Sequence, residues 1–144
     1  MALAITADAD VMYLLDTNIK SELRRPRPHA GLVAWLTSIA SERLFISAVT
    51  LGELQAGVEN ARQRDSGRAE IIESWIDDVA ASYNVLPMDA GAFRCWARLM
   101  QGQPVDLIAD AMIAATAVVH NLTVVTRNMR DFERLGVTAF NPFG

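Results

Sequence analysis

The chain has 144 residues, of which 51% are hydrophobic and 21% charged, and its formal net charge at pH 7 is −4. This length suits one compact domain with a sizeable core, and the apolar content excludes general disorder. Because the net charge is negative, the chain is not a broadly basic nucleic-acid coat. Contact with an anionic partner would need local basic clusters or bound metal.

The sequence gives no sign of export or membrane insertion. The single cysteine, Cys95, cannot form an internal disulfide and is expected in the core. No apolar run reaches the roughly 20 residues that span a membrane, since residues 107–119 are interrupted by Asp110. Residues 1–11 lack a basic n-region, so we expect an N-terminal extension of unknown role, a domain at 12–144 and a cytoplasmic location without membrane contact.

The first expected strand ends in polar residues. Residues 11–15 form a short apolar run typical of a buried parallel strand, and an amphipathic helix is expected from Asn18 onward. Asp16 therefore stands at the carboxyl end of a strand, where ligands bind in open α/β sheets. The alternative for an isolated Asp-Thr-Asn is a helix cap.

A proline-containing loop and a second helix follow. Pro26 and Pro28 stop the first helix and display Arg24, Arg25 and Arg27 on a turn. These arginines are either a solvated loop or phosphate contacts near Asp16, and both interpretations remain open at this point. The apolar spacing of residues 32–39 then predicts a helix packed on the core.

The second strand leads into a long helix that carries an acid. Residues 44–46 form the strand, Ser47 closes it, and the helix begins near residue 49. Glu53 lies about one turn into that helix, where it could simply complement the helix dipole. Its small and apolar sequence neighbours favour a partner instead, because an unpaired carboxylate among them would be costly.

Further helices and strands complete the alternation. An amphipathic helix is expected over residues 69–83, an edge-like strand over 85–88, and a helix over 90–100 capped by Asp89. Asp106 begins an alanine-rich helix and is explained by capping. Asp110 interrupts that helix, and a charge tolerated there needs a ligand.

The last expected strand, residues 122–125, ends in a polar cluster from Thr126 to Asp131. The strand–helix alternation predicts a three-layer α/β/α domain with a mostly parallel central sheet. Its acidic residues would then face one crevice, where clustered carboxylates raise one another's pKa. A hard divalent cation relieves this repulsion, and all-oxygen ligands favour Mg²⁺ or Mn²⁺ over zinc.

Other catalytic sets are poorly supported. His29 and His120 are the only histidines, and the sequence has neither a P-loop nor a glycine-rich dinucleotide motif. A haloacid-dehalogenase-like site would need a second acid where Asn18 stands. Metal-assisted hydrolysis of a phosphodiester remains.

Four motifs, in order and spacing, resemble those of PIN-domain ribonucleases, and in particular the VapC and FitB-like toxins of bacterial toxin–antitoxin modules. The motifs are Leu14-Leu15-Asp16-Thr17-Asn18, Ser47-x-x-Thr50-x-Gly52-Glu53-Leu54, Asp110-x-x-Ile113-Ala114-Ala115-Thr116-Ala117 and Thr126-Arg127-Asn128-x-x-Asp131-Phe132. Each motif alone is weak, but the four together cover nearly the whole chain. The resemblance implies a PIN-like fold and a Mg²⁺- or Mn²⁺-dependent endoribonuclease that acts as a toxin.

The resemblance also implies roles for individual residues. Asp16 and Asp110 would be metal ligands, with Glu53 as a third acid that binds directly or through water. Many members have a fourth acid where this chain has Asn128, and Asp131 could supply charge nearby. The remaining expected site residues either support the ligands or contact RNA: Thr17, Asn18, Ser47 and Thr126 as supports or caps, and Arg24, Arg25, Arg27, Arg127 and Arg130 as RNA contacts.

Family members form homodimers and are inhibited by a small antitoxin. Apolar helical residues beyond what one domain readily buries, Trp35, Trp75, Trp96 and Met100, also favour a dimer. We further expect a VapB-like antitoxin to point an arginine at the acids, since its planar fork can engage two carboxylates at once. Two alternatives stay open: a non-catalytic PIN-like binding module, and a metal-dependent DNA nuclease or phosphohydrolase.

Overall fold

The sheet is parallel throughout. The structure, a computed structural model, describes residues 11–144, so most of the expected N-terminal extension, residues 1–10, lies outside the described residues. The strands are β1 (Tyr13–Leu15), β2 (Leu44–Ser47), β3 (Asn84–Leu86), β4 (Thr123–Val125) and β5 (Ala139–Phe140). They lie in the order β3-β2-β1-β4-β5, and each neighbouring pair is parallel. The expected parallel α/β architecture is confirmed.

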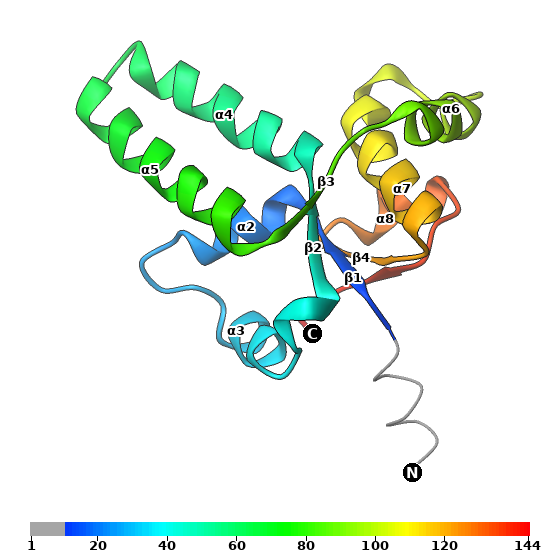
Figure 1. The fold of residues 1–144 in the computed structure, drawn as a ribbon, viewed down its shortest axis with the longest axis horizontal. Coiled ribbons are helices and arrows are strands. Elements are labelled where there is room, and N and C mark those ends of the chain that lie inside the picture. The colour runs from blue at the N-terminus through cyan, green and yellow to red at the C-terminus, as the bar shows by residue number, and fades with distance from the viewer. Residues whose placement is uncertain (1–10) are drawn as a thin grey trace.

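Helices cover both faces of this sheet (Figure 1). The α-helices are α2 (Thr17–Leu23), α3 (Ala30–Thr37), α4 (Ala48–Arg62), α5 (Ser66–Ser82), α6 (Ala90–Leu99), α7 (Ile108–His120) and α8 (Met129–Arg134), and the 3₁₀ turns are η1 (Ser41–Arg43) and η2 (Val105–Leu107). In the view of Figure 1, α2 to α5 lie to one side of the strands and α6 to α8 to the other. No helix of the described residues is long and apolar enough to cross a membrane.

The central strand is apolar on both faces because both faces are covered. Leu14 packs in one core cluster with Ile113 and Phe132, whereas Leu15 packs in the other with Ile19. Leu14 and Leu15 are both fully buried. Successive strand residues point to opposite faces, so a central parallel strand has a continuous apolar run rather than an alternating one. β1 is thereby fixed at the middle of the sheet, with Asp16 directly after it.

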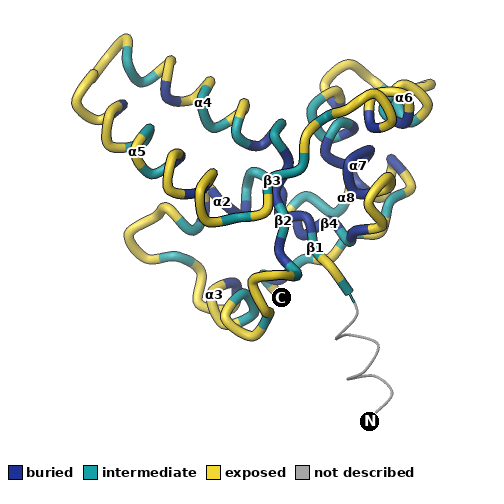
Figure 2. The backbone as a smooth tube through the Cα atoms, viewed as in Figure 1, coloured by how far each residue is buried: buried dark blue, intermediate teal, exposed yellow. Residues whose placement is uncertain are grey.

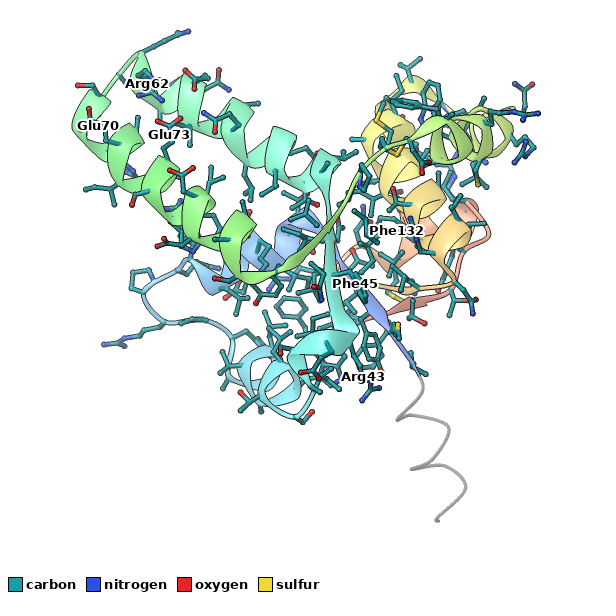
Figure 3. All side chains as sticks on the ribbon, in the orientation of Figure 1. Arg43, Phe45, Arg62, Glu70, Glu73 and Phe132 are labelled. Carbon is teal, nitrogen blue, oxygen red and sulfur yellow. The ribbon has the colours of Figure 1, made fainter. Side chains whose placement is uncertain are left out.

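Helix α7 is the most deeply buried helix (Figure 2). Its inward residues are mostly alanines, which let α6 and the sheet approach closely. By contrast, the helices α4 and α5 form a hairpin with an exposed tip, held by a small apolar cluster around Val58 and Ile76. Arg62 and Glu73 join the two helices through a 2.9 Å contact between Nη2 and Oε1 (Figure 3).

Some local expectations were wrong. The polar cluster after β4 leads into the short helix α8, residues 129–134, and neither this helix nor β5 was expected. Both elements are too short to show a clear periodicity. Asp106 lies in η2 and does not cap α7, because Leu107 precedes that helix and makes no side-chain cap hydrogen bond. Asp89 does cap α6, and Cys95 is buried, as expected.

The apolar residues that favoured a dimer pack within the monomer instead. Trp35, Trp75, Trp96 and Met100 are each partly buried against one of the core clusters. The large exposed apolar side chains are different ones: Met12, Val33, Ile71, Phe93, Val105, Ile108, Val118, Val119 and Phe140. Exposed apolar surface is therefore present, but at residues that the sequence did not indicate.

Lys20, the only lysine of the chain, is buried between α2 and α5. It is 2% exposed, and its Nζ lies 3.1 Å from the centre of the Tyr83 ring. Within the described part of the chain, no carboxylate forms an ion pair with it. The ring face attracts an ammonium ion, but burial dominates and lowers the pKa of Lys20 to about 7.

This buried amine predicts that stability increases with pH above neutrality. The unfolded chain keeps a proton on Lys20 up to its ordinary pKa of 10.5, whereas the folded chain loses it at about 7. The free energy of unfolding should therefore rise between pH 7.5 and 9.5, by at most about 1.4 kcal/mol per pH unit. Lys20→Met should be more stable at pH 7.5 and lack this rise in urea titrations. An equal rise in both proteins would contradict the prediction.

Candidate active site

A cleft of about 450 Å³ opens where the carboxyl ends of the central strands meet. Its lining residues are Asp16, Thr17, Asn18, Ser21, Glu22, Arg25, Glu53, Asp110, Arg127 and Asn128. They come from Asp16 between β1 and α2, from α2, α4 and α7, and from the loops that follow α2 and β4. Three acids that are distant in the sequence, Asp16, Glu53 and Asp110, thus share one cleft.

Asp16 is fixed at both carboxylate oxygens. Its Oδ1 accepts a hydrogen bond from the backbone N–H of Thr17 at 2.7 Å, and its Oδ2 accepts one from the hydroxyl of Thr126 at 2.8 Å. Its own N–H donates to the carbonyl of Val125 at 2.9 Å. Burial raises the pKa of Asp16, only partly offset by these two hydrogen bonds, and the charge of Glu53 raises it further. Asp16 therefore precedes α2 as a cap and also faces the cleft.

The Thr126 hydroxyl connects the loop after β4 to helix α2. It accepts hydrogen bonds from the backbone N–H of Asn128 at 2.8 Å and from Nδ2 of Asn18 at 3.3 Å. The Asn18 carbonyl oxygen accepts in turn from the Arg127 N–H at 3.3 Å. With both acceptor positions occupied, the single hydroxyl proton of Thr126 is directed to Asp16. The predicted supporting roles of Asn18 and Thr126 thus have a geometric basis.

Glu53 is connected to the residues next to Asp16 by a hydrogen bond from Thr17. The Thr17 hydroxyl donates to Oε1 of Glu53 at 2.6 Å, and its oxygen lies 3.2 Å from the hydroxyl of Thr50. The expected partner of Glu53 is therefore present, although Glu53 is exposed and burial is not the reason for the pairing. Small neighbours in sequence leave this position open to the cleft. Glu53 is nevertheless partnered and lines the site.

Asp110 lies in the first turn of α7, and its pKa is strongly raised by its surroundings in the cleft. Burial, followed by the charges of Asp16, Asp131 and Glu53, raises the pKa of Asp110 to about 7. None of the ion pairs among residues 11–144 involves any of these four acids. Their negative charge is therefore not compensated by an arginine or lysine.

Asn128 and Asp131 act together. Nδ2 of Asn128 donates to Oδ2 of Asp131 at 2.7 Å. Asn128 lines the cleft, whereas Asp131, in the first turn of α8, does not line it but lies close enough to raise the pKa of Asp110. An amide thus lines the cleft at this position, with a carboxylate hydrogen-bonded to it.

Other expected residues lie elsewhere. Ser47 is fully buried and caps α4 by accepting from the Val49 N–H at 3.0 Å, so its cap interpretation is the correct one. Of the five arginines, only Arg25 and Arg127 line the cleft. Arg24, Arg27 and Arg130 do not.

The sequence analysis missed three residues near the site: Ser21, Glu22 and Thr50. Helical spacing could have indicated them. Ser21 and Glu22 follow Asn18 by three and four positions, and Thr50 precedes Glu53 by three, so each lies on the same helical face as a residue already chosen. Polar residues on the cleft-facing side of α2 and α4 can thus be predicted by helical spacing from Asn18 and Glu53.

The donor set suits a hard divalent cation. The acids of the cleft offer carboxylate oxygens. Each carboxylate oxygen of Asp16 accepts one hydrogen bond, at 2.7 Å for Oδ1 and 2.8 Å for Oδ2, which leaves lone pairs free. Among residues 11–144, no group of three or more histidine, cysteine or acidic side chains is placed so that it could hold a metal ion. Mg²⁺ does not need three, because it keeps several waters and takes only one or two carboxylates from the protein.

The order of these residues along the chain matches a known family. The PIN domain family model matches residues 13–137. The chain belongs to the PIN-domain family. Among characterised relatives, it is 36% identical to toxin FitB of Neisseria gonorrhoeae over 140 residues, covering 92% of this chain and 99% of FitB. It is also 36% identical to VapC ribonuclease Y4jK of Sinorhizobium fredii, covering 92% of this chain and 98% of that protein.

Solved structures of toxin–antitoxin complexes and of FitAcB share the fold. The crystal structure of FitAcB from Neisseria gonorrhoeae superposes with a TM-score of 0.80 at 34% identity, covering 92% of this chain and 99% of that chain. A toxin–antitoxin complex from Klebsiella pneumoniae gives a TM-score of 0.66 at 25% identity, covering 90% of this chain and 97% of that chain. The three-layer PIN-like architecture expected from the sequence is confirmed.

The crowding of acids predicts that Asp110 destabilises the metal-free protein. Its pKa of about 7 in the folded chain exceeds the ordinary 3.8, so stability falls as pH rises from about 4 to 7. Asp110→Asn should flatten this dependence and raise the melting temperature at pH 8 with chelator present, by about 3 °C for each 1 kcal/mol of relieved repulsion. A marked fall in melting temperature would instead make Asp110 a structural partner.

Proposed function

We propose that this PIN domain is a metal-dependent endoribonuclease and the toxin of a toxin–antitoxin module, hydrolysing RNA phosphodiester bonds. The observation that carries this proposal is the convergence of Asp16, Glu53 and Asp110 on one cleft, where none of the three forms an ion pair with another part of residues 11–144. Relatives named as a toxin and as a VapC ribonuclease, each aligned over 92% of this chain, support it. RNA and antitoxin would be met in the cytoplasm.

The cleft residues have distinct roles in this proposal. Asp16 and Asp110 would hold Mg²⁺ or Mn²⁺, with Glu53 binding directly or through water. Such a cation supplies Lewis-acid stabilisation of charge on the phosphodiester and a lower pKa for the attacking water. Thr17 and Thr126 hold the Asp16 carboxylate in one orientation. Asn128 presents an amide to the cleft, and Asp131, hydrogen-bonded to Asn128, adds negative charge close to Asp110.

A cognate antitoxin would need to neutralise the same acids. A solved relative is a toxin–antitoxin complex. We propose a small VapB-like partner whose arginine enters the cleft and engages Asp16, Glu53 and Asp110 in place of the cation. An arginine fits this position because its planar fork can bind two carboxylates and stays charged.

Cleavage of RNA should depend on both a divalent cation and Asp110. With total RNA and Mg²⁺, the wild-type protein should cut, and chelator should stop it. Asp16→Asn and Asp110→Asn should each lower the rate by about 100-fold or more, the range typical for loss of one preorganised electrostatic group. Cleavage ends mapped by sequencing provide the measurement.

Asp106→Asn is the matched control, since this exposed acid lies four positions before Asp110 and lines no part of the cleft. It should cut at the wild-type rate. Metal-independent cutting, or full activity in Asp110→Asn, would contradict the proposal. Cleavage of single-stranded DNA alone would select the DNA nuclease, and the absence of any metal-dependent cleavage would select the non-catalytic module, whose acidic crevice would hold a basic protein tail.

The exposed apolar residues predict a homodimer. Val118 and Val119 are 50% and 44% exposed on α7, and Phe93 is 45% exposed on α6. Burying such side chains against a second copy is favourable, and a two-fold dimer is the commonest way to do so. Sedimentation velocity at micromolar concentration should show a species of twice the mass. A monomer under these conditions would count against the prediction.

A further inference from the structure

The acidic cleft has a basic wall that one buried carboxylate organises. Glu22 is 6% exposed and accepts three hydrogen bonds. Arg25 Nη1 and Arg127 Nη2 contact its Oε1 at 3.2 and 3.3 Å, and the His29 N–H donates to Oε2 at 3.0 Å. Two arginines from different loops, one after α2 and one after β4, are thus held by the same side chain.

Arg127 is fixed from a second direction by the C-terminal segment. Its guanidinium carbon lies 3.9 Å from the centre of the Phe143 ring. Phe143 in turn packs edge-to-face on His29, with ring centres 5.0 Å apart. Stacking on an aromatic face leaves the in-plane N–H groups of a guanidinium free for other acceptors. Arg127 is therefore oriented without losing its capacity to bind an anion.

The exposure of the three side chains shows where the free donors point. Glu22 is covered, whereas the side chains of Arg25 and Arg127 are 66% and 51% exposed. Burial alone would raise the pKa of Glu22, but the His29 N–H and both arginines hold it below its ordinary value. The trio Glu22, Arg25 and Arg127 thus carries one net positive charge at the margin of an acidic cleft, with most guanidinium N–H donors unused.

An RNA backbone that enters this cleft needs positively charged side chains beside the acids. The acids repel every phosphate except the one that a cation shields, so a neighbouring phosphate requires a local positive charge. A guanidinium binds phosphate oxygens with two parallel hydrogen bonds. Among the described arginines, Arg25 and Arg127 are those that line the cleft.

We propose that Arg25 and Arg127 form a subsite for the RNA backbone phosphate that flanks the scissile bond, and that Glu22 is the positioning residue that holds them there. This inference rests on the proposed ribonuclease function and specifies its substrate contacts. Phe143 supports the same geometry from the C-terminus.

Steady-state cleavage of a 5′-fluorescein RNA oligonucleotide, taken from a site mapped in total RNA, tests the subsite. Arg25→Ala and Arg127→Ala should each raise KM about tenfold, with kcat within about threefold. The slope of log(kcat/KM) against log salt should become shallower by about 0.7 for each arginine removed. Arg68→Ala removes the same charge near the tip of the α4–α5 hairpin and should match the wild type.

Glu22→Gln separates positioning from simple charge. Removal of a negative charge beside the substrate would by itself lower KM, whereas loss of the anchor for both arginines raises it. We expect KM to rise. Phe143→Ala gives a second test that leaves the net charge and the cleft lining unchanged and should also raise KM, so the inference stays falsifiable if Glu22→Gln fails to fold.

A lower or unchanged KM in folded Glu22→Gln would overturn the positioning role. If Glu22→Gln fails to fold, a wild-type KM in Phe143→Ala would overturn it instead. Arginine variants that match Arg68→Ala would overturn the subsite. If the positioning role or the subsite is overturned but RNA cleavage still depends on Asp110, the proposed ribonuclease function is not affected. If wild-type protein does not cleave RNA, or Asp110→Asn still does, the proposed function itself fails.

Discussion

The hydrogen bond from Thr126 to Asp16 is the contact on which the site depends. It joins the residues that follow the two central strands, β1 and β4, at the edge where parallel strands open a cleft. Because Leu14 and Leu15 bury both faces of β1, Asp16 cannot move away from this edge without disturbing both core clusters. The carboxylate is thereby held in a buried position with its orientation fixed. The other cleft acids are then brought to it by helices α4 and α7, which begin beside the same edge.

This arrangement separates opposite charges that would otherwise pair. Asp16, Glu53 and Asp110 lie close together without an arginine, although Arg25 and Arg127 line the same cleft. Both arginines are instead bound to Glu22, which keeps them from neutralising the acids. The cleft therefore has an acidic part suited to a cation and a basic part suited to phosphate. Such a division stores electrostatic repulsion in the folded state, a common feature of functional sites, which are often locally unfavourable for stability.

The sequence predicted the features that follow from strong local patterns. Asp16 after a buried strand, and Asp110 within the apolar helix α7, could be predicted as site residues. Burying an unpaired carboxylate among apolar residues costs free energy, so such a residue indicates a partner or a ligand. The order of the strands fits the parallel sheet that the alternation implied. What could not be predicted depends on tertiary contacts. Glu22 looks like a solvated helix residue in the sequence, but it is buried in the fold. Its carboxylate accepts hydrogen bonds from Arg127, in the loop after β4, and from the N–H of His29, and both of these residues pack against Phe143. The two-residue strand β5 and the six-residue helix α8 are too short for periodicity to reveal.

Binding of Mn²⁺ to Thr126 variants tests the central claim most directly, since Thr126 orients Asp16 but carries no charge of its own. Thr126→Val keeps the shape of the side chain and removes the hydroxyl, whereas Thr126→Ser keeps the hydroxyl. Loss of a hydrogen bond that orients a metal ligand typically weakens affinity by about 10–100-fold. Electron paramagnetic resonance of free Mn²⁺ in titrations should therefore show affinity reduced by at least about tenfold in Thr126→Val and close to wild type in Thr126→Ser. Equal affinity in folded Thr126→Val and wild-type protein would contradict the account.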